Sequence, residues 1–443
     1  MRPGGRRPGR RGPGQAQAGC GQGVTGQDVP GQDVPGQARP APGATADQER
    51  APHRDPGATR RGARGRTVLV AHPYPDLYGS DRQLVETIVA LRTTGLDVRV
   101  ALPQDGLLRP LLEETGARVA VLPFTVLRKA LLSPSGLTRL AGGAAGELRR
   151  LHAVVGASGA DLVLVNTVTM PWWPLAGRAG RVPVLVHVHE AEDTQALVLR
   201  AGLNAPLLAA TRVVTNSYAS RRALLAAQPL LAGRTQVVHN GVPAPDTPLA
   251  PLRRRVPGDP LRLALVGRLS PRKGTDVALE ALARLRGLGY QATLAVAGSV
   301  FPGYEWYEAE LRQRAARPDL AGAVTFLGYV HPTWPVLEEA DVVMVPSRVE
   351  PFGNTAVEAM HAARPLVASR IQGLEEVVTD RATGLLVAPE DPVALAGALA
   401  ELADRPAWAA DLAANAAERA AERFSVAGYR ATMVDVVTGL LGP

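Results

Sequence analysis

The sequence predicts an α/β protein of two facing Rossmann-like domains, each with a parallel sheet, and an interdomain cleft. After Arg66, short β-branched runs alternate with helical stretches, and the runs lack a polar face. Strands that are apolar on both faces and separated by helices are typical of doubly wound parallel sheets. The stretch 243–260 carries six prolines, has no usable periodicity and separates two sets of such runs. We therefore expect two α/β domains joined by one linker.

The first domain is predicted at residues 67–245, the linker at 246–260 and the second domain at 261–425. A helix from about Ser80 to Gly95 follows the opening run, as expected of a strand and its crossover helix. Strands of the first domain are predicted at 67–73, 97–103, 118–123, 161–166, 183–187, 212–216 and 236–240. Those of the second are predicted at 261–266, 292–297, 324–327, 341–345, 365–368 and 384–387. Ala-rich helix is predicted from Pro392 to Leu441, and its end, 426–443, can cross back to the first domain.

The composition is that of a folded globular chain. The 443 residues are 46% hydrophobic and 20% charged, which excludes a wholly disordered or fibrous protein and suits two or three domains. No apolar run approaches the roughly 18 residues that span a bilayer. The single cysteine, Cys20, excludes an intrachain disulfide and a cysteine metal cluster, so a reducing cytoplasm is the expected compartment.

Residues 1–66 differ from the rest of the chain. They are rich in Gly, Pro, Gln and Arg, and they hold a charge of +7 out of the net +8. Such a segment cannot offset its ordering entropy, so we predict a disordered extension without the apolar core of a signal peptide. Two interpretations stay open: a dispensable extension or early start codon, and a basic arm that touches anionic lipid or nucleic acid. The basic charge therefore says little about the folded body.

Ligands of parallel sheets bind beyond the carboxyl ends of the strands, so functional residues are expected there. In the second domain, the strand 261–266 leads into a glycine turn with Arg268 and Lys273, just before a helix. Two cations beside such a turn and a helix N-terminus can bind a diphosphate. Lys273 is one of only two lysines in the chain, which favours a specific ammonium at this loop. The alternative is an ordinary solvated basic turn.

A second candidate loop follows the strand 341–345. It contains Glu350, and Gly353 then opens a helix whose second turn carries Glu358. The helix N-terminus can face a phosphate, while the carboxylates accept hydrogen bonds from sugar hydroxyls. The alternative is a surface acid and a helix salt-bridge partner. The loop 370–375, after the strand 365–368, can present backbone N–H groups to the same ligand.

In the first domain, the loop after the opening strand ends in Gly79 and Ser80. Gly79 permits close approach of the backbone to a ligand, whereas Ser80 can equally serve only as a helix N-cap. His187 and His189 lie at the end of another strand. A metal site needs a third ligand, and none is in evidence. We therefore expect a single histidine at the cleft, which donates a hydrogen bond to a substrate oxygen.

Four motifs occur together in a specific order and spacing. They are Gly79-Ser80-Asp81, Val238-His-Asn240-Gly241-Val, Gly267-Arg268 with Lys273-Gly274, and Glu350 to Glu358. By these motifs, residues 67–442 resemble family 4 of the retaining nucleotide-sugar glycosyltransferases, which have the GT-B fold of two facing Rossmann-like domains. This chain has Tyr78 where many members have a further glycine.

The resemblance implies roles for the matching residues of the second domain. Arg268 and Lys273 would neutralise the donor diphosphate. Glu358 would hold the ribose hydroxyls, and Glu350 would contact the transferred sugar. Phe352, Gly353 and Asn354, between these two acids, are placed with the donor-binding residues.

In the first domain, the resemblance implies that Gly79 brings the backbone to the phosphate or the acceptor. His189 would be the cleft histidine near the donor sugar, with His187 on the same strand face as the alternative. The expected catalytic residues are therefore His189, Arg268, Lys273 and Glu350.

The resemblance also implies a site without metal, which agrees with the lack of an Asp-x-Asp cluster at a strand end. No cofactor is expected, because the nucleotide sugar is the substrate. The nucleoside diphosphate would depart from an oxocarbenium-like sugar while Arg268, Lys273 and the helix at Gly353 stabilise the developing negative charge. Retention follows if the acceptor hydroxyl attacks from the face that the diphosphate leaves and a phosphate oxygen takes its proton. Domain closure over the donor is expected from the two-domain layout.

Other functions stay open. A nucleotide-sugar epimerase or a glycan phosphorylase has the same fold, and a non-catalytic binding protein for glycans or nucleotide sugars is a further alternative, whereas a glycosidase is disfavoured. The expected partners are a nucleotide sugar and a glycan, lipid-linked or small-molecule acceptor, without specific nucleic acid. Trp172-Trp173 and the stretch 126–132, which carries Arg128 and Lys129, fit either an interfacial membrane patch or core packing and a glycan groove. The expected location is the cytoplasm, with peripheral contact to the inner face of the cell membrane as the alternative.

Overall fold

The computed structural model describes residues 65–75, 79–127, 134–191, 195–301 and 303–442. Nearly all of the predicted extension 1–66 lies outside these residues, and so do Tyr78, Arg128 and Lys129. No helix of the described ranges is long and apolar enough to cross a membrane.

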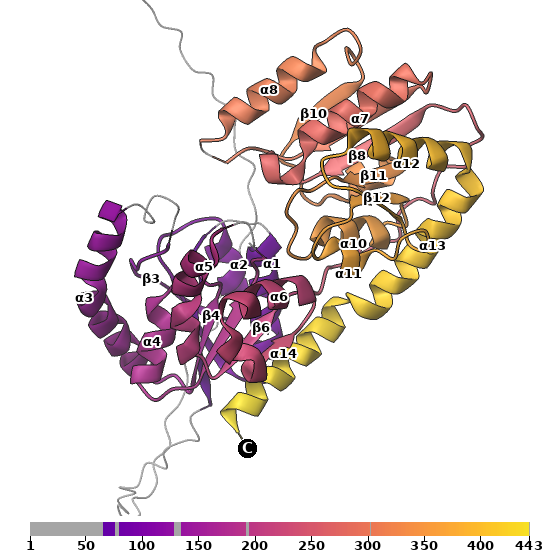
Figure 1. Ribbon diagram of the computed structural model, residues 1–443. Helices are drawn as coiled ribbons and strands as arrows, with labels where there is room; N and C mark the ends of the chain where they lie inside the picture. The colour runs from indigo at the N-terminus through magenta and orange to yellow at the C-terminus, as the bar shows by residue number, and fades with distance from the viewer. Residues whose placement is uncertain (1–64, 76–78, 128–133, 192–194, 302, 443) are drawn as a thin grey trace, which may run out of the picture. The chain divides into compact units, whose positions relative to one another are not determined.

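The first sheet has seven parallel strands within the described residues, in the order β3-β2-β1-β4-β5-β6-β7 (Figure 1). In that order their bounds are Arg118–Val121, Asp97–Leu102, Thr67–Ala71, Leu162–Asn166, Val184–Val188, Arg212–Thr215 and Thr235–Val237. Val68 of β1 pairs with Val98 on one side and Leu162 on the other. The strands β1, β4 and β5 are buried along their whole length, so each falls on one of the apolar runs of the sequence.

Six parallel strands form the second sheet in the described part of the chain, in the order β10-β9-β8-β11-β12-β13. Their bounds are Val324–Gly328, Ala292–Ala297, Leu261–Val266, Val342–Val345, Leu366–Ser369 and Leu385–Val387. Two Rossmann-like parallel sheets confirm the predicted fold class. In each sheet, successive strands are added first on one side of a central strand and then on the other. The central strand is β1 in the first sheet and β8 in the second, and ligands of such sheets bind near its carboxyl end.

Helices cover both faces of the first sheet (Figure 1). They are α1 (Gly79–Thr93), α2 (Leu108–Glu114), α3 (Pro134–Ser158), α4 (Trp172–Ala179), α5 (Leu197–Asn204) and α6 (Tyr218–Ala227), with the 3-10 turns η2 (Ala205–Ala209) and η3 (Pro229–Arg234). Apolar side chains of α1 and α2 form one core layer, and those of α3, α4 and α6 form the other. Trp173 is 1% exposed and packs edge-on against Phe124, so core packing accounts for this half of the Trp172-Trp173 pair.

The second sheet is covered in the same way. Its helices are η4 (Pro271–Lys273), α7 (Thr275–Gly287), α8 (Glu305–Ala315), α9 (Trp334–Glu339), α10 (Asn354–His361), α11 (Leu374–Val377), α12 (Pro392–Asp404) and α13 (Pro406–Arg423). One core layer is formed with α7, α8 and α12, and the other with α9, α10 and α11, while α13 contributes to both. The predicted Ala-rich helix is divided at Pro406 and at Ser425, because proline starts a new helix at its first position and the Ser425 hydroxyl caps the next.

The last helix, α14 (Val426–Leu441), packs on the first domain (Figure 1). Its Tyr429, Met433 and Val437 belong to the same core layer as Ile88 of α1. The Tyr429 hydroxyl lies 2.5 Å from the Thr87 hydroxyl of α1. The chain therefore returns to the domain in which it began.

Candidate functional site

Lys273 and Glu350 meet at the carboxyl end of the second sheet. Lys273 ends the turn after β8, Glu350 lies in the loop after β11, and their Nζ and Oε2 atoms are 2.5 Å apart. The Ser347 hydroxyl donates a hydrogen bond to the same carboxylate oxygen, and Glu350 is 8% exposed. A cation from one loop and an acid from another, predicted separately, thus form one partly buried ion pair.

Two glycines make this meeting possible. Gly274 has a φ of 66°, and a Cβ there would lie 2.0 Å from the carbonyl oxygen of Pro346, so the turn after β8 touches the start of the Glu350 loop. Gly353, with a φ of 115°, precedes the first residue of α10. Both φ values lie in the region that favours glycine. The close approach of the two loops therefore depends on glycine at these positions.

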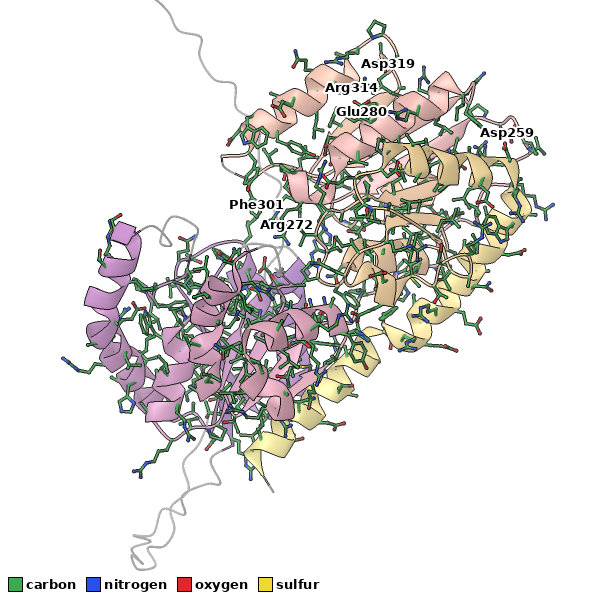
Figure 2. All side chains as sticks on the ribbon, in the orientation of Figure 1. Asp259, Arg272, Glu280, Phe301, Arg314 and Asp319 are labelled. Atoms are coloured by element: carbon green, nitrogen blue, oxygen red, sulfur yellow. The ribbon has the colours of Figure 1, made fainter. Side chains whose placement is uncertain are left out.

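Arg268 lies beside an aromatic ring that the sequence did not single out. Its guanidinium carbon is 3.1 Å from the centre of the Phe301 ring. Phe301, labelled in Figure 2, lies in the loop after β9. An arginine over an aromatic face is held by the negative charge of the ring face. Phe301 thus orients one of the two predicted cations, and its position just after a strand end is the one sequence signal that could have found it.

Glu358 lies in the second turn of α10. It is half-buried, and the Thr333 hydroxyl donates a hydrogen bond to its Oε2 over 3.2 Å. Burial raises the pKa of this carboxyl, while the Thr333 hydrogen bond and the positive charges of Arg82 and Lys273 oppose the rise. Arg82 comes from α1 of the first domain and donates to the Tyr329 hydroxyl over 3.4 Å. Neither Arg82 nor Thr333 was predicted as a site residue.

The predicted residues Gly79 and Asn354 lie against each other. A Cβ on Gly79 would be 3.0 Å from Nδ2 of Asn354, and Oδ1 of the same asparagine accepts a hydrogen bond from Asn240 at 2.9 Å. Gly79 starts α1 and Asn354 starts α10, so the first turns of these helices meet. The motif around Asn240 therefore contacts the first residue of α10, one of the residues expected to bind the donor.

Phe352 takes a different position from the one that the sequence favoured. It is 2% exposed, and the centre of its ring lies 5.5 Å from the ring centre of Phe424 and 5.8 Å from that of His239. The side chain therefore belongs to the core beneath the loop, and only its backbone is left to face a donor.

In the loop 370–375, which was expected to present backbone N–H groups to the ligand, some of these groups already donate within the protein. The backbone N–H of Gly373 donates to the carbonyl oxygen of Glu350, and that of Leu374 donates to Ile371. Gln372 instead accepts from the Glu350 backbone N–H through Oε1 at 2.9 Å and donates through Nε2 to the Ala191 carbonyl at 2.9 Å. This loop therefore supports the Glu350 loop and connects it to the first domain.

His189 is the more accessible of the two candidate histidines. His187, the next-to-last residue of β5, is in register with Asn166, is 1% exposed and stacks on Tyr429, and burial lowers its pKa well below the usual value. His189 is half-buried, and its ring centre lies 4.0 Å from that of His187. Burial, with a smaller contribution from His72, lowers the pKa of His189 to about 3, against the opposing charge of Asp81. Both rings are thus neutral, and the described residues contain no group of three His, Cys, Asp or Glu side chains that could hold a metal.

A cavity of about 370 Å³ opens beside the carboxyl ends of β2 and β3. It is lined by Pro103, Gln104, Pro123, Phe124, Thr125, Val126, Arg139 and Leu140. Its walls hold both apolar and polar side chains, among them the guanidinium of Arg139 from α3. The cavity belongs to the first domain.

Comparison with known families decides among proteins of this fold. The family described as "Glycosyltransferase Family 4" matches residues 78–244, and "Glycosyl transferases group 1" matches residues 260–405. The chain belongs to glycosyltransferase family 4. The first match contains Gly79 and His189, and the second contains all the predicted donor-site residues of the second domain.

Curated relatives match parts of the chain. A glycogen synthase of Mycobacterium tuberculosis is 37% identical over 190 residues, which are 42% of this chain and 44% of the relative. A D-inositol 3-phosphate glycosyltransferase of Acidothermus cellulolyticus is 34% identical over 223 residues, 48% of this chain and 50% of the relative. The chain thus spans about half the length of the curated relatives it matches.

Solved structures with a similar fold cover more of the chain. Anabaena HepE in complex with UDP-glucose is 25% identical with a TM-score of 0.69, over 84% of this chain and 99% of HepE. A sucrose-phosphate synthase of Thermosynechococcus elongatus, at 22% identity and a TM-score of 0.66 over 85% of this chain and 99% of its own, shares the fold.

Proposed function

We propose that this family 4 protein is a retaining glycosyltransferase that transfers a sugar from a nucleotide-sugar donor without a metal ion. The observation that carries the proposal is the Lys273–Glu350 pair at the carboxyl end of the second sheet, with Arg268 in the same loop as Lys273 and Glu358 in α10, which follows the Glu350 loop. A cation for a diphosphate and acids for sugar hydroxyls are the groups that such a donor requires.

The donor diphosphate would lie between Arg268, Lys273 and the N-terminus of α10. Positive groups at this place stabilise the charge that develops on the leaving diphosphate more than they stabilise the bound donor. Lys273 would then exchange its contact with Glu350 for a phosphate oxygen. Glu350, released from the ammonium, is free to accept a hydrogen bond from the transferred sugar, and Glu358 to accept those of the ribose.

Retention requires the acceptor hydroxyl to attack from the face that the diphosphate leaves. The bond between the anomeric carbon and the phosphate oxygen breaks, and a bond from the same carbon to the acceptor oxygen forms. The acceptor proton passes to the departing phosphate oxygen, so no protein nucleophile is needed.

UDP-glucose is the first donor to test, because HepE is solved with it and shares the fold over 84% of this chain. The names of the curated relatives point to two acceptor classes, a glucan and an inositol phosphate. Both classes are rich in hydroxyls, and we place the acceptor on the first domain, where the cavity beside β2 and β3 carries Arg139.

The experiment is a thermal-shift series on the full chain with UDP-glucose, GDP-mannose and ADP-glucose. One donor is expected to raise the melting temperature, and Lys273→Ala and Glu358→Ala are each expected to remove the shift. Arg314→Gln and Glu280→Gln are matched controls, because Arg314 of α8 pairs with Glu280 of α7 and with Asp319 in the turn after α8 (Figure 2). Absence of a shift with every donor would overturn the proposal.

Five further measurements test its finer parts. The anomeric configuration of the product, read by NMR, decides retention, and activity in EDTA decides metal independence. Donor turnover without acceptor would indicate an epimerase, and a requirement for phosphate would indicate a phosphorylase. Flotation of the protein with anionic liposomes tests the predicted peripheral membrane contact.

A further inference from the structure

Four side chains of the first domain form a linear chain of hydrogen bonds that ends at His189. Its Nε2 lies 2.9 Å from Oδ1 of Asn166, and Nδ2 of Asn166 lies 2.9 Å from Nδ1 of His72. Nε2 of His72 lies 2.9 Å from Oδ1 of Asp81. Asp81, His72 and Asn166 are each no more than 2% exposed.

The chemistry of these groups sets the direction of every hydrogen bond. The Asp81 carboxylate can only accept, so the His72 proton is on Nε2 and the lone pair is on Nδ1. Asn166 must therefore turn its amide nitrogen towards His72 and its oxygen towards His189. His189 then donates from Nε2, and its Nδ1 carries the lone pair. The opposite direction would need a second proton on His72 inside a buried cluster.

The backbone around Asn166 is held in an unusual conformation. Thr167, the next residue, has a φ of 130°, which is costly for a β-branched side chain and persists only where other contacts enforce it. The Glu190 carboxylate accepts from the Thr167 hydroxyl and, at 3.0 Å, from the backbone N–H of His189. The ends of β4 and β5 are thus tied together at the point where Asn166 meets His189.

We propose that Asp81, His72 and Asn166 are positioning residues that hold His189 in its Nε2-protonated tautomer, so that Nδ1 selects donor sugars presenting a hydroxyl to it. The selection rests on the proposed function, because it places His189 beside the donor sugar. His189 would accept a hydrogen bond there, instead of donating one as the sequence led us to expect. A sugar carrying a carboxylate or a fluorine at that position has no proton to donate and is rejected.

The tautomer is tested first, without any donor. Full-length protein with ¹⁵N-labelled histidine rings is examined by long-range ¹H–¹⁵N correlation, in which protonated and bare ring nitrogens resonate far apart. The His189 signals, assigned by their loss in His189→Gln, are expected to show a proton on Nε2 and none on Nδ1. His152→Gln, at an exposed site, confirms the assignment. A proton on Nδ1 would overturn the proposal.

Asp81→Asn tests whether the Asp81 carboxylate sets the tautomer of His189. An asparagine can donate to His72, which permits the whole chain of hydrogen bonds to reverse, so both tautomers of His189 are expected. Asp81→Glu keeps a carboxylate and is expected to restore the single tautomer. Glu86→Gln removes an acid from the same helix, α1, where it pairs with Arg430, and is the matched control. We call the hydrogen-bonded chain of Asp81, His72, Asn166 and His189 the relay. An unchanged His189 tautomer in folded Asp81→Asn would show that the relay does not set it.

The selection is tested by calorimetry with UDP-glucose and with analogues in which each glucose hydroxyl in turn is replaced by fluorine. One analogue is expected to bind about 10- to 100-fold more weakly to the wild type, because it leaves Nδ1 without a donor, with a smaller loss in Asp81→Asn. Equal binding of every analogue would overturn the selection. If UDP-glucose itself does not bind, it is not the donor. The tautomer measurement, which needs no donor, still decides whether the relay holds His189 in its Nε2-protonated tautomer.

Discussion

Nζ of Lys273 lies 2.5 Å from Oε2 of Glu350, so the cation expected to bind a diphosphate is paired with the acid expected to contact the sugar. The pair joins the loop after β8 to the loop after β11. A donor must therefore compete with Glu350 for the ammonium before Lys273 can bind a phosphate.

This competition predicts opposite effects on the binding of UDP, which has a diphosphate but no sugar. Glu350→Gln is expected to raise the affinity for UDP about 5-fold, because it removes the competing acid from a partly exposed pair. Lys273→Ala is expected to lower that affinity at least 10-fold. Calorimetry with UDP measures both, and weaker binding in Glu350→Gln would contradict the competition.

Glu358 predicts a specific dependence of stability on pH. Because burial raises the pKa of Glu358, the folded state retains its proton to higher pH than the unfolded state. The free energy of unfolding therefore falls as pH rises from below 4.5 through the folded pKa. Glu358→Gln is expected to gain stability relative to the wild type above this range and to match it below, in urea titrations at several pH values.

Glu401 is the control with the opposite sign. Its pKa is lowered, chiefly by the hydrogen bond from Arg381, so its contribution is present at neutral pH and is lost on acidification. Glu401→Gln is thus expected to lose stability at neutral pH. The same sign for both variants would contradict the assignment of these environments.

Gly274 predicts a large effect of one methyl group. In Gly274→Ala the new Cβ would lie 2.0 Å from the backbone oxygen of Pro346 at a φ of 66°, so one of the two loops must move. We expect a loss of at least about 2 kcal/mol in the free energy of unfolding, together with weaker donor binding. Gly287→Ala is the matched control, because a Cβ at the end of α7 meets nothing within 4 Å. It is expected to gain about 0.5–1 kcal/mol.

Substitutions of Tyr429 measure how strongly α14 is held on the first domain. Tyr429→Phe removes a buried hydroxyl that lies 2.5 Å from the Thr87 hydroxyl, and is expected to cost about 1 kcal/mol of unfolding free energy. Tyr429→Ala also removes the ring and is expected to cost about 3–5 kcal/mol. Urea unfolding measures both, and a neutral Tyr429→Ala would show that the helix is not docked.

The sequence predicted the strands well because central strands of parallel sheets are apolar on both faces and so have a local signature. It was least accurate at β7, predicted at 236–240 and found at Thr235–Val237, because β7 is an edge strand and edge strands are often very short. Lys273 and Glu350 were found in the same way, because glycine turns and acids after strand ends are local patterns.

The remaining site features depend on distant partners. Arg82 meets Tyr329, 247 residues away, and the relay links His72 to Asn166 over 94 residues. No local pattern distinguishes these side chains from solvated or core residues. Phe352 illustrates the converse, because its neighbours in sequence suggest a ligand contact while its neighbours in space are core aromatics.

The return of α14 has a consequence for synthesis on the ribosome. The sheet of the first domain is complete once β7 has emerged, but the apolar surface over α1 stays uncovered until residues 426–441 follow. During translation of the whole second domain, this surface is available to a chaperone or to another nascent chain. A chain terminated after Phe424 would keep it exposed permanently, so such a truncation is expected to be retained by chaperones even though both sheets are intact.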